Sequence, residues 1–242
     1  MNISFVVTSY NYAEYIKETI DSIKNQTIQP FEIIVVDDYS TDNSCKILEE
    51  IDGIKLIKHD KNSGQLASII TGLKEATGDY ISFIDSDDVI LAEYSQVLSD
   101  YLNTNDVSLV VCNAEKQEFL NCNTHPFGGW YWKPMSNGMF KKNVLNCILN
   151  YKHTDLWKIC PDKLLFNIAH LLGNSMNITD KLVYKREHSK NAGKIKNRFW
   201  INVKNNLVIR HETYRLINDK EKQNIILKSH SYLLKQIINK IL

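Results

Sequence analysis

Strand and helix signals alternate along the first 115 residues, and this alternation restricts the fold more than any other feature of the sequence. Short apolar runs rich in valine and isoleucine predict strands, and apolar residues at helical spacing between them predict helices. The pattern predicts an α/β fold with a mostly parallel, doubly wound sheet, in which ligands bind beyond the carboxyl ends of the strands. The predicted strands span residues 3–8, 32–37, 54–59, 80–85 and 107–113, and the predicted helices 13–25, 42–51, 64–76 and 92–104.

Polar clusters follow three of these strands, at Thr8–Asn11, Asp37–Asp42 and Asp85–Asp88. Three neighbouring carboxylates repel one another unless a cation lies between them, and hard oxygen ligands suit Mg²⁺ or Mn²⁺ that also holds a diphosphate. A solvated turn with helix-capping acids is the alternative for any one cluster. The convergence of three clusters on one sheet edge favours a binding site. The turn after the first strand contains no glycine, which excludes the glycine-rich dinucleotide fingerprint there.

Four ordered motifs resemble one family. The sequence reads Val6-Val7-Thr8-Ser9-Tyr10-Asn11, then Val35-Val36-Asp37-Asp38-x-Ser40-x-Asp42, then Asn62-x-Gly64 with Thr77-Gly78-Asp79-Tyr80, and finally Asp85-x-Asp87-Asp88. This set resembles family 2 of the inverting nucleotide-sugar glycosyltransferases, which have the GT-A fold. The resemblance is strong over residues 3–90 and weaker through residues 134–142, Pro161-Asp162 and 184–191. Residues 200–242 match no family pattern.

The resemblance assigns roles to residues at the strand ends. It implies that Thr8 and Tyr10 line the base and ribose of the donor nucleotide. Asp38 would accept the N3–H of a uracil-type base, a role that suits a carboxylate. Asp85 would face the ribose or a metal-bound water.

The same resemblance implies a divalent metal, Mn²⁺ or Mg²⁺, at the end of the acidic strand. Asp87 would be a direct ligand, and Asp88 would support that ligand or contact the donor sugar. His188 lies where some members bring a histidine to the metal or the diphosphate, although a surface histidine without such a role is the alternative. The metal would stabilise the departing diphosphate.

The resemblance places the catalytic base at Asp162, directly after Pro161 at the start of a predicted helix. The helix dipole favours an ionised carboxylate at this position. The alternative is a helix cap, with Asp155 as the reserve base. Trp130 and Trp132 lie in a glycine-flanked aromatic loop that either stacks on the acceptor sugar or packs internally.

Two positions depart from the family pattern. Many members carry Arg-Asn where this chain has Ile69-Ile70, so a polar contact on that helix is missing. The base motif often reads Glu-Asp, and Pro161 replaces the glutamate here. The second departure concerns the placement of the base and leaves the resemblance to the family intact.

The chain is expected to divide into a nucleotide-sugar-binding half (1–115), an acceptor-binding half (116–199) and a basic helical extension (200–242). Residues 181–242 hold 15 Lys and Arg against 4 Asp and Glu. Apolar residues recur at helical spacing between the lysines of residues 222–242. This region either docks on an anionic membrane surface, caps the domain or joins a homo-oligomer. Nucleic-acid binding is disfavoured, because the basic residues alternate with aliphatic ones rather than forming a stacking surface.

Cysteine usage indicates a reducing compartment. The five cysteines are odd in number and widely spaced, and none forms a Cys-x-x-Cys motif. No apolar run reaches the roughly 18 residues that a membrane span requires. The expected location is therefore the cytoplasm, with peripheral attachment to the inner face of the membrane as a variant.

These observations predict a metal-dependent inverting glycosyltransferase. It would move a sugar from a UDP- or dTDP-linked donor to a hydroxyl of a glycan or lipid-linked acceptor, in bacterial surface polysaccharide synthesis. The alternative is a degenerate, non-catalytic GT-A-like protein that binds a partner through its basic C-terminal region. Retention of all five acids (Asp38, Asp85, Asp87, Asp88 and Asp162) argues against that alternative.

Overall fold

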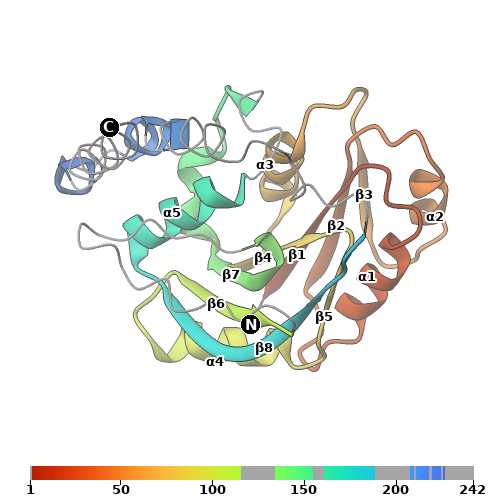
Figure 1. The fold of residues 1–242 in the computed structure, drawn as a ribbon, viewed down its shortest axis with the longest axis horizontal. Helices are drawn as coiled ribbons and strands as arrows, with labels where there is room; N and C mark the ends of the chain where they lie inside the picture. The colour runs from red at the N-terminus through yellow and green to blue at the C-terminus, as the bar shows by residue number, and fades with distance from the viewer. Residues whose placement is uncertain are drawn as a thin grey trace, which may run out of the picture.

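The computed structural model describes residues 2–115, 134–154, 161–188, 208–209, 211–217, 220–224 and 226. These residues build a mixed α/β fold around a curled eight-stranded sheet with strand order β3-β2-β1-β4-β7-β6-β8-β5 (Figure 1). Strand pairs β1–β2, β1–β4, β2–β3 and β6–β8 are parallel. Pairs β4–β7, β6–β7 and β5–β8 are antiparallel. The predicted doubly wound α/β architecture is confirmed.

The N-terminal half follows the predicted alternation closely. Its strands are β1 (Ile3–Ser9), β2 (Glu32–Asp37), β3 (Lys55–Lys58), β4 (Tyr80–Asp85) and β6 (Leu109–Ala114). Its helices are α1 (Ile16–Lys24), α2 (Ser44–Glu49), α3 (Gln65–Glu75) and α4 (Tyr94–Thr104). Strand β5 (Asp88–Ile90) was not predicted, because it has only three residues and begins with an aspartate.

The C-terminal half extends the same sheet. It contains the short 3₁₀ helices η1 (Met135–Asn137) and η2 (Lys142–Ile148), strand β7 (Gly138–Lys141), helix α5 (Asp162–Gly173) and strand β8 (Met176–Lys185). Helix α5 begins directly after Pro161, where the sequence predicted a helix to start. Because β8 pairs with both β6 and β5, its last residues lie beside the acidic turn after β4.

The core has two layers, one on each face of the sheet. Helices α3 and α5 cover one face, where Leu73 and Phe166 are fully buried. Helices α1 and α4 cover the other face, where Ile20 and Tyr94 are fully buried. Strands buried on both faces carry continuous apolar runs, as expected for a central parallel sheet.

The described residues of the C-terminal region are mostly helical and lie against α5 (Figure 1). Ile209 belongs to the core layer of α3 and α5, and Ile217 and Ile226 are buried as well. The Tyr151 hydroxyl donates a hydrogen bond to Glu212 Oε2 at 2.9 Å. This part of the region therefore packs on the domain, which was one of the predicted alternatives.

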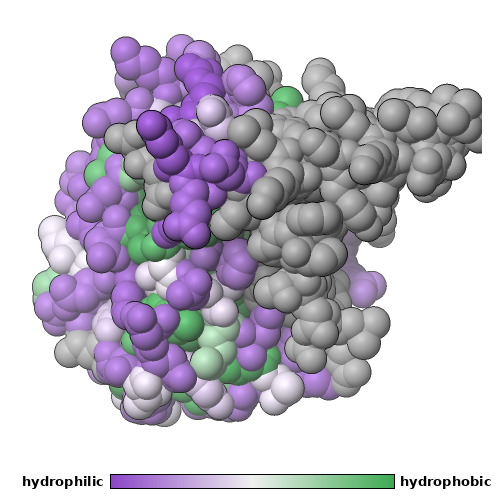
Figure 2. Space-filling view, turned by 90° about the vertical axis from the view of Figure 1, so that its left-hand side faces the viewer, coloured by the Kyte–Doolittle hydropathy of each residue, from purple (hydrophilic) through white to green (hydrophobic). Residues whose placement is uncertain are grey.

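The outer surface beside these elements is mainly polar. Figure 2 shows hydrophilic residues over most of the described part of this face, with hydrophobic residues in small groups between them. No helix among the described residues is long and apolar enough to cross a membrane.

Candidate active site

The carboxyl ends of β1, β2 and β4 bring the predicted donor-binding residues to one edge of the sheet. Thr8 lies opposite Asp85 in the β1–β4 pair, and Ser9 lies opposite Asp37 in the β1–β2 pair. Thr8 is half-buried, and Tyr10 is exposed just beyond the strand end. The parallel register thus places Thr8, Tyr10, Asp38 and Asp85 in neighbouring positions, as the sequence predicted.

Several polar residues of these loops hold the loops together. The Asn11 side-chain oxygen accepts hydrogen bonds from the backbone N–H groups of Thr41 and Asp42, at 2.7 and 3.2 Å. Asp37 accepts bonds from the backbone N–H and hydroxyl of Ser40, at 2.8 and 2.5 Å. These residues therefore fix the loop frame on which the other side chains are presented.

Asp38 is buried and already accepts several hydrogen bonds. Its carboxylate accepts from the backbone N–H groups of Ser63 and Gly64 at 2.8 and 2.7 Å, and it contacts His59 Nδ1 at 2.8 Å. A carboxylate has about four acceptor positions, so one remains for a ligand. Asp38 ties the loop before α3 to the end of β2, and its predicted contact with a base stays a prediction.

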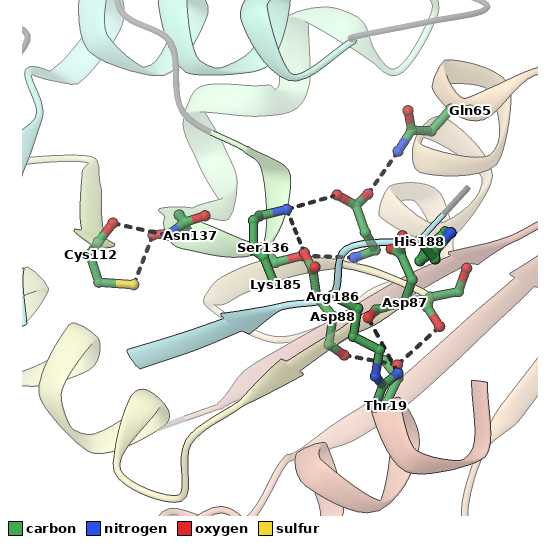
Figure 3. A network of polar contacts seen from close by, with 12 residues as sticks. Thr19, Gln65, Asp87, Asp88, Cys112, Ser136, Asn137, Lys185, Arg186 and His188 are labelled. Atoms are coloured by element: carbon green, nitrogen blue, oxygen red, sulfur yellow. Dashed lines mark hydrogen bonds and ion pairs between the residues drawn. The ribbon is translucent and has the colours of Figure 1, made fainter. Parts of the chain in front are cut away.

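The acidic turn between β4 and β5 is anchored by two hydroxyl groups, those of Thr19 and Ser136 (Figure 3). The Thr19 hydroxyl of α1 donates to the backbone oxygens of Ser86 and Asp88, at 3.0 and 2.8 Å. The Ser136 hydroxyl donates to Asp88 Oδ2 at 2.6 Å and accepts the backbone N–H of Asp85 at 2.9 Å. The turn is therefore held rigidly before any ligand binds.

Lys185 is the last residue of β8. Among the described residues, it carries the positive charge nearest to Asp85 and Asp88. Its Nζ lies 2.8 Å from Asp88 Oδ2 and 3.9 Å from Asp85 Oδ2 (Figure 3). Asp85 also accepts a hydrogen bond from the Gln65 side chain at 2.9 Å. The predicted contact of Asp88 with the donor sugar is untested, but its side chain is buried and bound to Ser136 and Lys185.

Burial dominates the electrostatics of this cluster. Burial raises the pKa of Asp85 to about 8, the positive charge of Lys185 opposes that rise, and the charges of Asp88, Asp87 and Asp162 add to it. Burial also raises the pKa of Asp88, again against the opposing effect of Lys185. Burial and mutual repulsion therefore disfavour the ionised forms of these acids in the free protein, and a cation bound beside them would stabilise those ionised forms.

Asp87 and His188, the two predicted metal ligands, lie together. His188 Nε2 is 2.9 Å from Asp87 Oδ2. The His188 ring stacks on Tyr15, with centroids 4.8 Å apart, and meets the Tyr12 ring edge-on at 5.9 Å. The Arg186 guanidinium also lies over the Tyr15 ring, 5.2 Å from its centroid, and pairs with Glu18. This arrangement orients the imidazole toward the carboxylate.

The donor set of this pair fits a divalent metal that shares its coordination with a ligand. A carboxylate oxygen and an imidazole nitrogen are suitable ligands for Mn²⁺. Within the ranges that the structure describes, no group of three or more His, Cys, Asp or Glu side chains is arranged to hold a metal ion. Asp87 and His188 would thus leave most coordination positions to donor oxygens and water.

The predicted base, Asp162, is the first residue of α5 and is buried. Its charge is among those that raise the pKa of Asp85, so the two carboxylates belong to one electrostatic cluster. Its Oδ1 accepts the backbone N–H of Lys163 at 2.9 Å, a contact that a capping role would also produce. Trp130, Trp132 and Asp155 lie outside the described residues.

Sequence reasoning missed the residues that hold the acids in place. Lys185, Ser136 and Tyr15 are separated from the acidic turn by many residues, and none belongs to an acidic motif. The sequence feature that came closest to indicating Lys185 was the resemblance over residues 184–191. It placed His188, and with it this stretch of chain, near the predicted metal site. Nothing in that pattern indicated an ion pair between Lys185 and Asp88.

The sheet order and the acidic site at its carboxyl edge define a transferase of the GT-A type. The chain belongs to glycosyl transferase family 2, whose model matches residues 4–183. The curated relatives include a UDP-Glc:alpha-D-GlcNAc-diphosphoundecaprenol beta-1,3-glucosyltransferase, WfgD, from Escherichia coli. It is 35% identical over 115 residues, which cover 47% of this chain and 46% of the relative. Across eight such relatives, the matched part is 14% to 66% of their length.

Solved structures with the same fold bind nucleotide sugars. TarS residues 1–349 from S. aureus, in complex with UDP-GlcNAc, matches with a TM-score of 0.70 at 20% identity, over 93% of this chain and 70% of that one. The mannosyltransferase PcManGT from Pyrobaculum calidifontis, in complex with GDP-Man and Mn²⁺, matches with a TM-score of 0.73 at 20% identity. That match covers 96% of this chain and 69% of the other. At this identity the likeness establishes the fold.

Proposed function

We propose that this protein is a metal-dependent, inverting glycosyltransferase that uses a UDP- or dTDP-linked sugar. The observation that carries the proposal is the Asp87–His188 pair at the acidic turn, beside the half-buried Asp85 and the buried Asp88. The turn is anchored before any ligand binds, as a preorganised site requires. The TarS and PcManGT complexes support a nucleotide sugar as the donor, although they differ in the base.

The chain's own residues would divide the work between donor and acceptor. Asp87 and His188 would hold Mn²⁺ or Mg²⁺, which when bound neutralises the donor diphosphate and stabilises it as it leaves. Thr8, Tyr10 and Asp85 would hold the nucleotide at the sheet edge. Asp162 would accept the proton of the attacking hydroxyl on the opposite side of the sugar, so that the anomeric configuration inverts.

The acceptor would be a glycan or a lipid-linked glycan in bacterial surface polysaccharide synthesis. The support is the match to the E. coli transferase, whose name specifies a diphosphoundecaprenol-linked acceptor. A peripheral position on the inner face of the membrane would suit such an acceptor. Co-sedimentation of the full chain and of a 1–226 truncation with anionic liposomes tests this; the truncation keeps Ile209, Ile217 and Ile226, which are buried. Equal and negligible binding by both proteins would refute membrane attachment.

A transfer assay tests the proposed chemistry directly. Wild-type protein, Asp162→Asn and Asp155→Asn are incubated with UDP-glucose, UDP-GlcNAc or dTDP-glucose, Mn²⁺ and diphosphoundecaprenol-linked GlcNAc. We expect nucleotide release by the wild type and at least a 100-fold slower rate for Asp162→Asn, on the order expected for loss of a general base. NMR of the product should show an inverted anomeric centre. Retention of configuration, or full activity of Asp162→Asn, would contradict the assignment.

A further inference from the structure

Two exposed tyrosines occupy matching positions in the loops that follow β1 and β2. Tyr10 lies between Ser9 and Asn11, and Tyr39 lies between Asp38 and Ser40. The two loops are joined on both sides of these tyrosines. The backbone N–H of Asp38 donates to the Ser9 carbonyl at 2.8 Å, and the backbone N–H of Asn11 donates to the Ser40 hydroxyl at 2.9 Å. Tyr10 and Tyr39 therefore flank one point on the sheet edge.

The backbone at Tyr39 indicates that its position serves a purpose other than packing. Tyr39 has a φ of 67°, in the left-handed region that is unfavourable for a bulky side chain. Tyr39 is 53% exposed and Tyr10 is 42% exposed. Burial of the Tyr39 ring in the core therefore does not offset the cost of this backbone conformation. Residues held in sparsely populated conformations cluster at functional sites, where the surrounding structure enforces them.

The surrounding hydrogen bonds do enforce this conformation. Ser40 is fixed to Asp37 through its backbone N–H and its hydroxyl, and Asn11 holds the backbone of Thr41 and Asp42. Asn11 also has a positive φ, 61°. Both tyrosines are thus presented from a rigid frame, which reduces the entropy that a ligand must remove on binding.

The carboxylate of Asp38, next to Tyr39, has about one hydrogen-bond acceptor position left for a base. The Asp38 carboxylate is 4% exposed as a residue and already contacts His59 and the backbone N–H groups of Ser63 and Gly64. With about one acceptor position left on Asp38, further recognition of a base at this point would come from contact with the face of its ring. Tyrosine rings suit that task, because every nucleobase has an aromatic face.

We propose that Tyr39 acts with Tyr10 as an aromatic platform for the base of the donor nucleotide, and that Tyr39 contributes donor affinity. The inference rests on the proposed function. It adds to that function a residue, Tyr39, that none of the family motifs specifies. Exposed tyrosines also occur at protein interfaces, so an effect on protein association without an effect on nucleotide binding is a contrary outcome of the test.

Calorimetric titration of UDP in the presence of Mn²⁺ tests the platform. Tyr39→Asn removes the ring but keeps a residue that tolerates a positive φ, so the loop should stay folded. Tyr39→Phe keeps the ring without the hydroxyl. Tyr101→Asn is the matched control, because Tyr101 is an exposed tyrosine on α4, away from the strand ends. Pyrophosphate with Mn²⁺ is titrated in parallel as a ligand without a base.

We expect Tyr39→Asn to raise the Kd for UDP by about 5- to 100-fold, the range that loss of one base–aromatic stack predicts. Tyr39→Phe and Tyr101→Asn should stay within about twofold of the wild type, and pyrophosphate binding should not change. A wild-type Kd for UDP in Tyr39→Asn would refute the platform while leaving the proposed function intact. An equal loss of pyrophosphate binding would refute it too, since the base would not be involved. A wild type that binds neither UDP nor pyrophosphate would overturn the proposed function itself.

Discussion

Lys185 is the residue on which the electrostatics of the acidic turn depend most. It is mostly buried and lies 2.8 Å from Asp88 and 3.9 Å from Asp85. A buried carboxylate that loses its partner is left uncompensated, which costs far more than loss of a surface ion pair. Lys185 thus stabilises the turn in the free protein.

Replacement of Lys185 by methionine should therefore be strongly destabilising. We expect Lys185→Met to lower the free energy of unfolding by about 3–5 kcal/mol. Lys58→Met is the matched control, because Lys58 pairs with Glu49 at the same 2.8 Å but with both side chains about half exposed. The control should lose less than about 1 kcal/mol in the same urea titrations. The double variant Lys185→Met/Asp88→Asn should recover part of the loss, and equal losses in the two single variants would contradict this account.

Asp87 differs from Asp88 because its side chain is turned toward His188 rather than toward Lys185. Asp87→Asn should leave the melting temperature of the free protein nearly unchanged and lower kcat by about 100-fold or more, on the scale of a lost metal ligand. Stabilisation by UDP with Mn²⁺, measured by thermal unfolding, should be lost as well. Full activity of Asp87→Asn would exclude its role as a metal ligand.

At the scale of elements, sequence patterns predicted what depends on local residues. The bounds of β2 and β4 match the prediction, because continuous apolar runs end there at acidic residues. The placement of Thr8, Asp38 and Asp85 at one edge followed from parallel pairing alone. Strand β5 and the Lys185–Asp88 pair could not be predicted, because they depend on pairing between residues 97 positions apart.

The C-terminal region shows the same division between local and long-range information. Its helical pattern was visible in the sequence, but three ways of using its apolar face remained open. The structure brings Ile209 into the core beside α5 and links Glu212 to Tyr151. Glu212 is buried, and although burial alone would raise its pKa, hydrogen bonds from His211 and Tyr151 lower it overall.

This contact predicts a specific dependence of stability on pH. Because the pKa of Glu212 is lowered on folding, its contribution is present above the unfolded-state pKa of 4.5 and is lost as the pH falls through the folded-state pKa. Glu212→Gln keeps an acceptor for Tyr151 but removes the charge. We expect it to be about 1 kcal/mol less stable than the wild type at pH 7, on the scale of a charge-assisted hydrogen bond. That difference should shrink below pH 4.5; a difference that is constant from pH 3 to pH 7 would contradict the charged contact.

At the scale of the whole molecule, one curled sheet joins the two expected halves. Strands β1, β2 and β4 supply the nucleotide edge, while the second half supplies Lys185 from β8, His188 from just after β8 and Asp162 from α5. The site therefore exists only when both halves are folded together. The predicted boundary near residue 115 stays a proposal about function, because the strand order β7-β6-β8-β5 crosses it without interruption.

The measurement that tests the central claim most directly is the thermal stability of the full chain with UDP, dTDP, GDP and CDP, each with and without Mn²⁺. The account predicts a rise in melting temperature with UDP or dTDP that requires Mn²⁺, because a ligand that binds only the folded state stabilises it. A larger rise with GDP would support a metal-dependent donor site but would show that the site prefers guanine over uracil or thymine. No rise with any nucleotide, with or without Mn²⁺, would contradict the claim that this sheet edge binds a nucleotide-sugar donor.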